Sequence, residues 1–480
     1  KIATNLQVYP TCVEVVNHTL ALFQDLAQGF MSSKHLLKLS AINYILGHHT
    51  HEHFPFLDDP ASSRNRTTFY STITSLVFLE DSAVTRFKSF VAPLQQVMVA
   101  LAQQAQDPMQ LRQEPVRQAL IGLFRDLRGI VMATSVKRTY GMVFEWLYPQ
   151  HMPLFLRTLQ VYADMPAVTT PLLKFISELV LNKNQRLTFD YSSPNGIKLF
   201  WEVSKILCEY GKHVLEAPAS GDPYATKYKG TWVCFQIFYR ALAGNYVNFG
   251  VFELYGDPSL NNALDVTLKL ALSVPLADTM AYRKLAKAYF QLMEILTLSH
   301  VAFLAQQETA TFVQLVSSLE AGIKSLDVSV SSQCASAVDN LAAYYFTHGV
   351  AADTKTPAAS RIGQHLEQHP QLLPGILHTL FEIIVFEDCS NQWSLSRPML
   401  SLILLNEQVF RELKTQIVTV QPVDRQQRLA TCFDRLMEGV HRSHRACTGR
   451  CSCSCSRAGR RPRAAGRAAG PRRGRARCDR

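Results

Sequence analysis

Apolar residues recur every three or four positions along almost the whole of the first 440 residues of this chain. Leu120, Leu123, Phe124, Leu127 and Val131 show the pattern, because such steps place side chains on one face of a helix. Strand-like alternation is hard to find, and no Asn-Gly or Asp-Gly turn separates two alternating runs. The pattern therefore predicts an all-α fold.

Several expected helix starts carry a residue that can cap free backbone N–H groups, followed by proline. Proline lacks an N–H group, so it costs nothing in the first turn of a helix. The pairs of this kind are Thr170-Pro171, Ser193-Pro194, Asp222-Pro223 and Asp257-Pro258. Together with the periodicity they predict helices near 149–163, 166–182, 193–216, 222–244, 257–275, 278–300, 308–325 and 330–347.

These helices are joined by short connections, which make neighbours antiparallel, and each pair must stack on others to bury its apolar faces. Pairs that begin at 149, 193, 257 and 308 are spaced by 44, 64 and 51 residues. Only the first spacing falls within the range of HEAT or armadillo repeats, about 40–47 residues. We therefore expect irregular HEAT-like antiparallel helix pairs stacked into an α-solenoid, with loops near 49–65, 245–255 and 348–360.

The helical pattern stops after Val440, which divides the chain into a body, 1–440, and a tail, 441–480. The tail holds 13 of the 49 basic residues and one of the 38 acidic residues, which leaves the body with 36 basic and 37 acidic residues. The tail also lacks large apolar residues, so it cannot bury enough surface to fold alone. We predict a disordered tail and a nearly neutral body.

The arginines of the tail could bind nucleic acid electrostatically, but no aromatic residue accompanies them to stack on bases. Arg, Ala, Gly and Pro also share GC-rich codons, which favours an alternative or mispredicted end of the chain. We expect no specific nucleic-acid partner. The chain begins at Lys1 within a helical pattern, so we expect a piece of a longer protein.

The widely separated cysteines of the body indicate a reduced, intracellular protein, and no apolar run is long enough for membrane insertion. His48, His49, His51 and His53 could suggest a zinc site, but no Cys, Asp or Glu stands at a familiar zinc spacing. A polar helix end and loop explains them more simply. Phosphate-binding loops, nucleophile elbows and zinc-protease motifs are also absent from the sequence. We expect no enzyme, no cofactor and no metal.

Two polar groups interrupt apolar helical runs and are candidates for partner binding. An exposed, salt-bridged face would explain the first group, whereas repeat proteins bind partners on their concave side. Capping and packing would explain the second group. The candidates are Arg125, Asp126 and Arg128 in the first group, and Glu387, Asp388 and Trp393 in the second.

Six segments, in order along nearly the whole body, resemble the exportin 7 and Ran-binding protein 17 family of the importin-β (karyopherin) superfamily. They are RTTFY at 66–70, LIGLFRDLRGI at 120–130, SSPNGIKLF at 192–200, NYVNFGVFELYGDPSLNNAL at 245–264, IIVFEDCSNQWSLSRPMLSLILLNE at 383–407 and LMEGV at 436–440. The resemblance implies a HEAT-repeat nuclear transport receptor. Such a receptor binds protein cargo together with GTP-loaded Ran, contacts nuclear pore proteins, and shuttles between nucleus and cytoplasm.

The resemblance places the body in the C-terminal part of the family. The N-terminal repeats that make the principal Ran contact in this superfamily then lie outside this sequence, so the chain alone should bind Ran poorly. The tail replaces the family's own continuation after Val440. The alternative is a helical-repeat scaffold for protein interactions without transport activity, because the Ran-binding repeats are missing.

Overall fold

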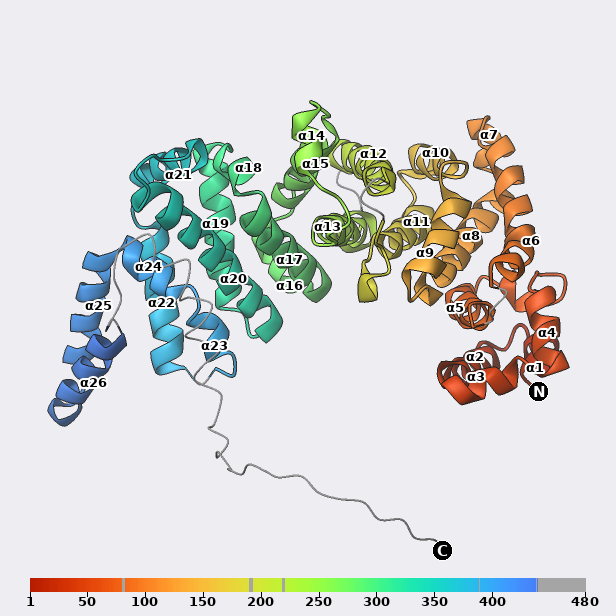
Figure 1. Cartoon of the computed structure of the whole chain (residues 1–480), viewed down its shortest axis with the longest axis horizontal. Helices are drawn as coiled ribbons and strands as arrows, with labels where there is room; N and C mark the ends of the chain where they lie inside the picture. Colours follow the sequence, from red (N-terminus) through yellow and green to blue (C-terminus); the bar gives the residue numbers. More distant parts are fainter. Residues whose placement is uncertain (80–82, 190–192, 218–220, 388, 437, 439–480) are drawn as a thin grey trace, which may run out of the picture.

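The computed structural model describes residues 1–79, 83–189, 193–217, 221–387, 389–436 and 438. Within these residues every regular element is a helix, and the helices follow one another along an arch with the N-terminus at one end (Figure 1). The tail lies outside the described residues. The all-α solenoid predicted from the periodicity is confirmed.

The first part of the arch runs to residue 185. Its elements are α1 (Ile2–Val8), α2 (Val13–Gln28), α3 (Phe30–Leu36), α4 (Ser40–Gly47), the 3-10 turn η1 (Pro55–Leu57), α5 (Asn65–Val77), α6 (Ala83–Gln104), α7 (Pro108–Leu111), α8 (Glu114–Ala133), α9 (Lys137–Leu147), α10 (Met152–Tyr162), α11 (Pro166–Leu179) and the 3-10 turn η2 (Lys183–Gln185).

The second part contains the remaining helices. They are α12 (Asn195–Glu216), the π-turn η3 (Tyr224–Tyr228), α13 (Lys229–Leu242), α14 (Gly250–Leu254), α15 (Ser259–Leu272), α16 (Leu276–Ala281), α17 (Arg283–Ser299), α18 (Val301–Ala305), α19 (Thr309–Ile323), α20 (Val328–Tyr345), the π-turn η4 (Phe346–Val350), α21 (Pro357–Gln368), α22 (Leu372–Phe386), α23 (Gln392–Leu395), α24 (Met399–Leu405), α25 (Glu407–Thr419) and α26 (Val423–Leu436).

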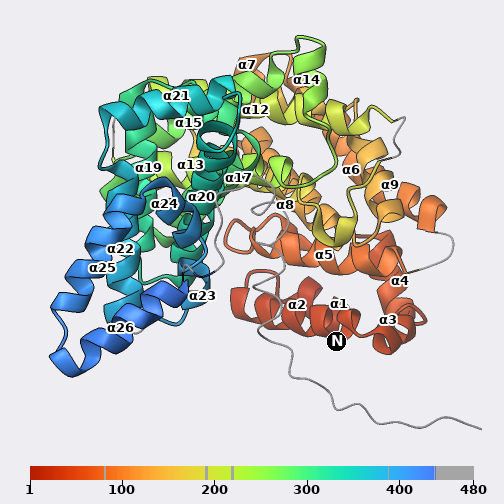
Figure 2. The same ribbon diagram turned by 60° about the vertical axis from the view of Figure 1, so that its left-hand side comes forward.

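The helices form two layers, as expected for stacked pairs. Helices α5, α8, α11, α13, α17 and α20 pack against one another in succession and line the inside of the arch (Figure 1). Helices α6, α10, α12, α15 and α19 lie on the outside, and the turned view keeps the same order along the chain (Figure 2). The inner layer is therefore the concave face of the solenoid.

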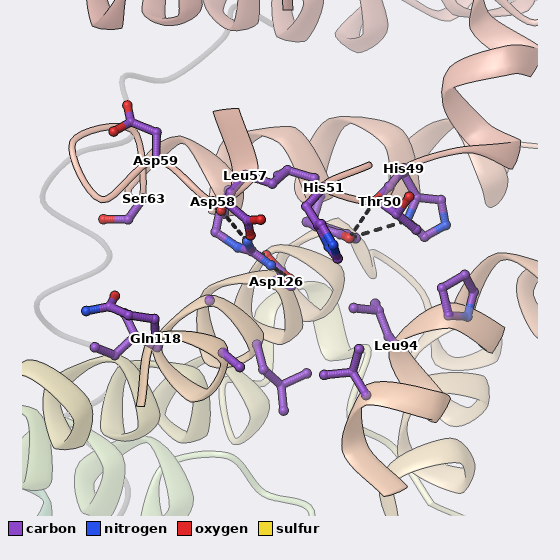
Figure 3. A pocket seen from close by; sticks show the side chains of 18 of the residues that line it. His49, Thr50, His51, Leu57, Asp58, Asp59, Ser63, Leu94, Gln118 and Asp126 are labelled. Carbon is purple, nitrogen blue, oxygen red and sulfur yellow. Dashed lines mark hydrogen bonds and ion pairs between the residues drawn. The ribbon is translucent and has the colours of Figure 1, made fainter. Parts of the chain in front are cut away.

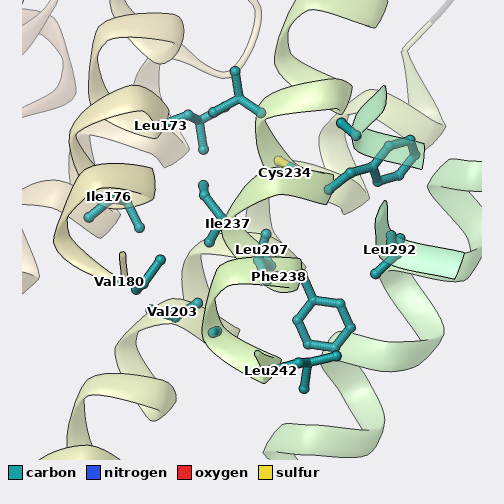
Figure 4. Close-up of a cluster of buried hydrophobic side chains, with 14 of the residues drawn as sticks. Leu173, Ile176, Val180, Val203, Leu207, Cys234, Ile237, Phe238, Leu242 and Leu292 are labelled. Carbon is teal, nitrogen blue, oxygen red and sulfur yellow. The ribbon is translucent and has the colours of Figure 1, made fainter. Parts of the chain in front are cut away.

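The core lies between the two layers, and its side chains come from helices far apart in sequence. Figure 4 shows one such cluster, which includes Ile176 of α11, Leu207 of α12, Phe238 of α13 and Leu292 of α17. All four are at most 1% exposed. Burial of an aliphatic or aromatic side chain of this size contributes about 1.5–3 kcal/mol, so this shared core holds successive pairs together.

A buried arginine joins three segments of the inner layer. Arg186 is fully buried and donates hydrogen bonds to the carbonyls of Val131 at 2.8 Å and Thr134 at 2.9 Å. It also donates to the carbonyl of Glu178 at 2.8 Å and forms an ion pair with its carboxylate at 3.2 Å. The guanidinium thus adds hydrogen bonds to carbonyls at the C-terminal ends of α8 and α11, where a helix has fewer N–H donors for its carbonyls.

Most of the expected helices are confirmed, with shifts of a few residues at their ends. Two details of the prediction are wrong. Thr170-Pro171 lies inside α11, because the helix already begins with proline at Pro166. The helix expected over 278–300 is two helices, because Tyr282 takes an extended conformation between α16 and α17. Asp257 precedes the N-cap residue Pro258, and its carboxylate accepts the backbone N–H of Ser259, the first residue of α15, at 2.8 Å.

Candidate partner-binding surface

The surface of α8 that faces the inside of the arch carries two of the predicted partner contacts, Arg125 and Arg128. Both are half-buried, whereas Asp126 is fully buried. A helix repeats about every 3.6 residues, so residues 125 and 128 share one face while residue 126 turns away from it. The three candidates on this helix therefore have different environments.

Asp126 forms an ion pair with Arg66 of α5 and does not face solvent. The Nε atom of Arg66 donates to Oδ1 of Asp126 at 2.8 Å, and a second hydrogen bond joins Nη2 to Oδ2. Arg66 also donates to the carbonyl of Leu57 in η1. A bidentate pair of this kind is strong and fixes orientation, so Asp126 positions α5 and η1 against α8.

The neighbouring glycines explain how the pair fits between two closely packed helices. A Cβ atom at Gly122 would lie 2.8 Å from Cζ of Arg66. One at Gly129 would lie 2.6 Å from the carbonyl oxygen of Thr67. Gly122, Asp126 and Gly129 share one face of α8, since they are spaced by four and three residues. The absence of a side chain at the two glycines lets α5 approach closely, with the Asp126 carboxylate between them.

Burial changes the ionisation of this site. Removal from water raises the pKa of Asp126 to about 6, and the charge and hydrogen bonds of Arg66 offset only part of that rise. Asp126 is therefore ionised at neutral pH. The same loss of solvent lowers the pKa of His49 to about 4, against a weaker opposing effect of its hydrogen bond to Phe90.

A cavity of about 400 Å³ lies beside the ion pair, between the 49–63 segment and helices α5, α6 and α8 (Figure 3). Asp58 and Asp59 lie along one side of it, and Leu94 and Gln118 lie opposite (Figure 3). The Nε2 atom of His49 donates to the carbonyl of Phe90 at 2.9 Å. This hydrogen bond joins the 49–63 segment to α6 across the edge of the cavity, so His49 has a structural role in packing.

The histidine-rich segment is held by contacts within the chain. His48 stacks on Tyr44 with ring centroids 4.5 Å apart, and Nδ1 of His53 lies 3.2 Å from the hydroxyl of Thr50. In the part of the chain that the structure describes, no group of three or more His, Cys, Asp or Glu side chains could hold a metal ion.

Arg125 and Arg128 differ in their contacts. Arg125 donates to the hydroxyl of Ser63, and its carbonyl accepts a hydrogen bond from Thr67 at 3.1 Å. Burial, followed by the charges of Arg64 and Arg66, lowers the pKa of Arg125. The Nε atom of Arg128 is shielded from solvent, and no acceptor among the described residues lies within hydrogen-bonding distance. Arg128 therefore keeps hydrogen-bonding capacity on the concave side.

The second group lies toward the other end of the arch, where α22 ends and α23 begins (Figure 1). Glu387 follows the last residue of α22 and is exposed. Trp393 is 70% exposed, which is unusual for the largest apolar side chain. Asp388 lies outside the described residues. The structure does not bring this group together with the group on α8.

The sequence motifs did not reveal which polar residues would meet. Arg66 and Asp126 belong to two of the segments quoted above, RTTFY and LIGLFRDLRGI, but nothing in either segment indicates the pair. No sequence motif marks Lys174 or Arg240, which also lie on inner helices. One signal for the pair of Arg66 and Asp126 was available in the sequence. Asp126 is an isolated acid in an apolar helical run, and a buried charge requires a partner of opposite charge.

These features define the class of protein: a curved helical-repeat protein. In the described residues no helix is both long and apolar enough to cross a membrane. The family described as Exportin-7-like, TPR domain, matches residues 1–65. HEAT and TPR repeats are both stacks of antiparallel helix pairs, so this agrees with the fold.

Longer relatives match almost the whole chain. Exportin-7-B of Xenopus laevis is 42% identical over 456 residues, which cover 92% of this chain and 42% of the frog protein. Ran-binding protein 17 of Mus musculus is 41% identical over 459 residues, with the same coverage. Exportin-7 of Dictyostelium discoideum is 34% identical over 92% of this chain and 43% of its own length.

The chain is therefore a homologue of the exportin-7 and Ran-binding protein 17 family, and it spans about 42% of the length of these relatives. The family resemblance read from the six segments is confirmed.

Proposed function

We propose that this chain is part of a nuclear transport receptor that binds protein cargo together with GTP-loaded Ran and carries it through nuclear pores. The observation that carries the proposal is the identity of 34–42% to proteins named exportin-7 and Ran-binding protein 17 over 92% of the chain. The proposal includes contact with nuclear pore proteins and shuttling between nucleus and cytoplasm. The body, 1–440, corresponds to the C-terminal repeats, and the tail, 441–480, is foreign to the family.

The concave face supports binding as the activity, and we propose that the chain is not an enzyme. Arg125 and Arg128 contact a partner in this proposal, and Asp126 keeps α5 in place beside them. Glu387, Asp388 and Trp393 form a second contact, because an exposed tryptophan contributes strongly to binding when a partner covers it.

The test is a pull-down with the complete protein that contains this chain, using Ran loaded with GTP or with GDP. We expect retention of Ran-GTP and little retention of Ran-GDP. The present chain alone serves as the comparison and should retain Ran weakly in either state. Equal retention of the two nucleotide states by the complete protein would contradict the proposal.

The alternative is a helical-repeat scaffold without a transport role. The coverage of less than half of each relative favours it, since the activity of a longer protein need not remain in a part. Movement of the complete protein between the two nuclei of a fused cell distinguishes the possibilities. Shuttling supports the receptor, and confinement to one compartment supports the scaffold.

A further inference from the structure

Four positively charged side chains lie near one another in the middle of the arch, each on a different helix of the inner layer. They are Arg128 of α8, Lys174 of α11, Lys229 of α13 and Lys284 of α17. With Trp232 of α13, whose ring lies 5.8 Å from Nζ of Lys284, they are called here the inner basic cluster.

Like charges surround Lys174 at the centre of this cluster. Burial, and after it the charges of Arg128, Lys229 and Lys284 with a smaller effect of Arg64, together lower the pKa of Lys174 to about 8. No carboxylate is among the groups that act on Lys174. The four charged members form no ion pair with any described acidic residue, in contrast to neighbouring Lys287, which pairs with Asp327 at 3.5 Å.

Two buried donors in the cluster also lack acceptors. The Nε atom of Arg128 and the Nε1 atom of Trp232 are shielded from solvent, and no described residue accepts a hydrogen bond from either. A buried donor without an acceptor destabilises the folded state, because it has lost its hydrogen bonds to water. Lys284 stands at the second position of α17, where the helix dipole disfavours a cation. Repulsion, unfilled donors and the dipole all make this arrangement costly in the free protein.

We propose that the inner basic cluster binds an acidic segment of a protein partner. Carboxylates would neutralise the four charges and accept hydrogen bonds from the two free donors. A concave surface of one charge also focuses its field, which raises the rate at which an acidic partner associates. This inference rests on the proposed transport function and adds to it the chemical class of one partner, an acidic protein segment.

A protein segment fits better than nucleic acid. Nucleic-acid binding needs positive charge along an extended backbone, whereas the body carries 36 basic against 37 acidic residues. A short acidic segment with a few carboxylates is sufficient to neutralise the four charges of the inner basic cluster.

The experiment uses the full chain, a fluorescent peptide of eight glutamates, and a matched peptide of eight glutamines. We expect the acidic peptide to bind with a strong dependence on salt. The double variant R128Q/K174Q should bind it at least about tenfold more weakly, since removed charge pairs commonly cost that much. Lys269 of outer helix α15 supplies the control, and K269Q should bind like the parent chain. Unchanged helical content and melting temperature show that the variants fold.

Carbodiimide cross-linking separates the cluster from the arginine-rich tail. The reagent joins peptide carboxylates to lysine amines, and residues 441–480 contain no lysine. We expect links at Lys174, Lys229 or Lys284. Links mainly at Lys269, or equal affinity of R128Q/K174Q and the parent, would overturn the proposal. A loss of single-stranded RNA binding in the double variant, with peptide binding unchanged, would also overturn it. None of these measurements involves Ran, so their outcome is independent of the test of transport.

Discussion

The Nε atom of Arg66 donates to Oδ1 of Asp126 at 2.8 Å, which joins α5 to α8 across 60 residues of sequence. Asp126 is fully buried, so the guanidinium is its source of opposite charge. The pair lies beneath the concave face and sets the spacing of two inner helices. The positions of Arg125 and Arg128 on α8 therefore depend on a contact inside the protein.

Replacing Asp126 with alanine should destabilise the chain by about 3–5 kcal/mol, because it leaves the buried guanidinium of Arg66 without its partner. Chemical denaturation measures the effect. The exposed pair of Arg112 and Asp164 is the control, and D164A should cost less than about 1 kcal/mol. A similar loss in both variants would show that the buried pair has no special role.

Acid should weaken the folded state through His49. Its pKa is about 4 in the folded chain and about 6.5 in the unfolded chain, so only the unfolded chain takes up the proton between these values. Stability from the neutral imidazole is therefore present above pH 6.5 and is lost toward pH 4. The difference in unfolding free energy between the parent and H49Q should fall by about 3 kcal/mol over that range.

The difference in unfolding free energy between the parent and H49Q isolates the effect of His49, which the pH dependence of the parent alone does not. Asp126 has a raised pKa of about 6, so the folded chain binds its proton more readily than the unfolded chain between about pH 4 and 6. That effect has the opposite sign and remains in both proteins. A difference between parent and H49Q that stays constant with pH would contradict the role given to His49.

Replacing Gly129 with alanine should destabilise the chain by about 1–3 kcal/mol, because the new methyl group would press on backbone atoms of α5. Thermal and chemical unfolding would detect it. Gly141 of α9 offers a matched control, since a Cβ there meets nothing within 4 Å. G141A should be neutral or stabilising by about 0.5–1 kcal/mol through helix propensity.

Phe381 of α22 is 3% exposed, and its ring lies 5.9 Å from Phe410 and 5.8 Å from Phe433 between ring centroids. F381A should therefore cost about 3–5 kcal/mol in unfolding free energy. Phe386 of the same helix is 58% exposed and serves as the control. Equal effects of F381A and F386A would contradict the packing assigned to α22, α25 and α26.

Lys174 should react with amine-directed labels at a lower pH than ordinary lysines. Its pKa is about 8, so about half of its amine is neutral at pH 8, whereas a pKa near 10.4 leaves under about 1% neutral. Mass spectrometry of labelled peptides against pH gives the midpoint. In R128Q the midpoint should rise, because one repelling charge is gone, while burial still holds it below that of a free lysine. Equal labelling midpoints for Lys174 in R128Q and in the parent chain would contradict the proximity of Lys174 and Arg128.

The sequence by itself determined the helices, the nearly neutral body and the resemblance to a family. Periodicity such as that from Leu120 to Val131 selects the buried face of each helix, and this is a local property of the chain. The tertiary structure alone decided which polar residues meet. Arg128, Lys174, Lys229 and Lys284 are separated by 46, 55 and 55 residues and lie near one another. The register of stacked helices aligns them, and this register depends on loop lengths and side-chain packing between neighbours, which no local pattern records.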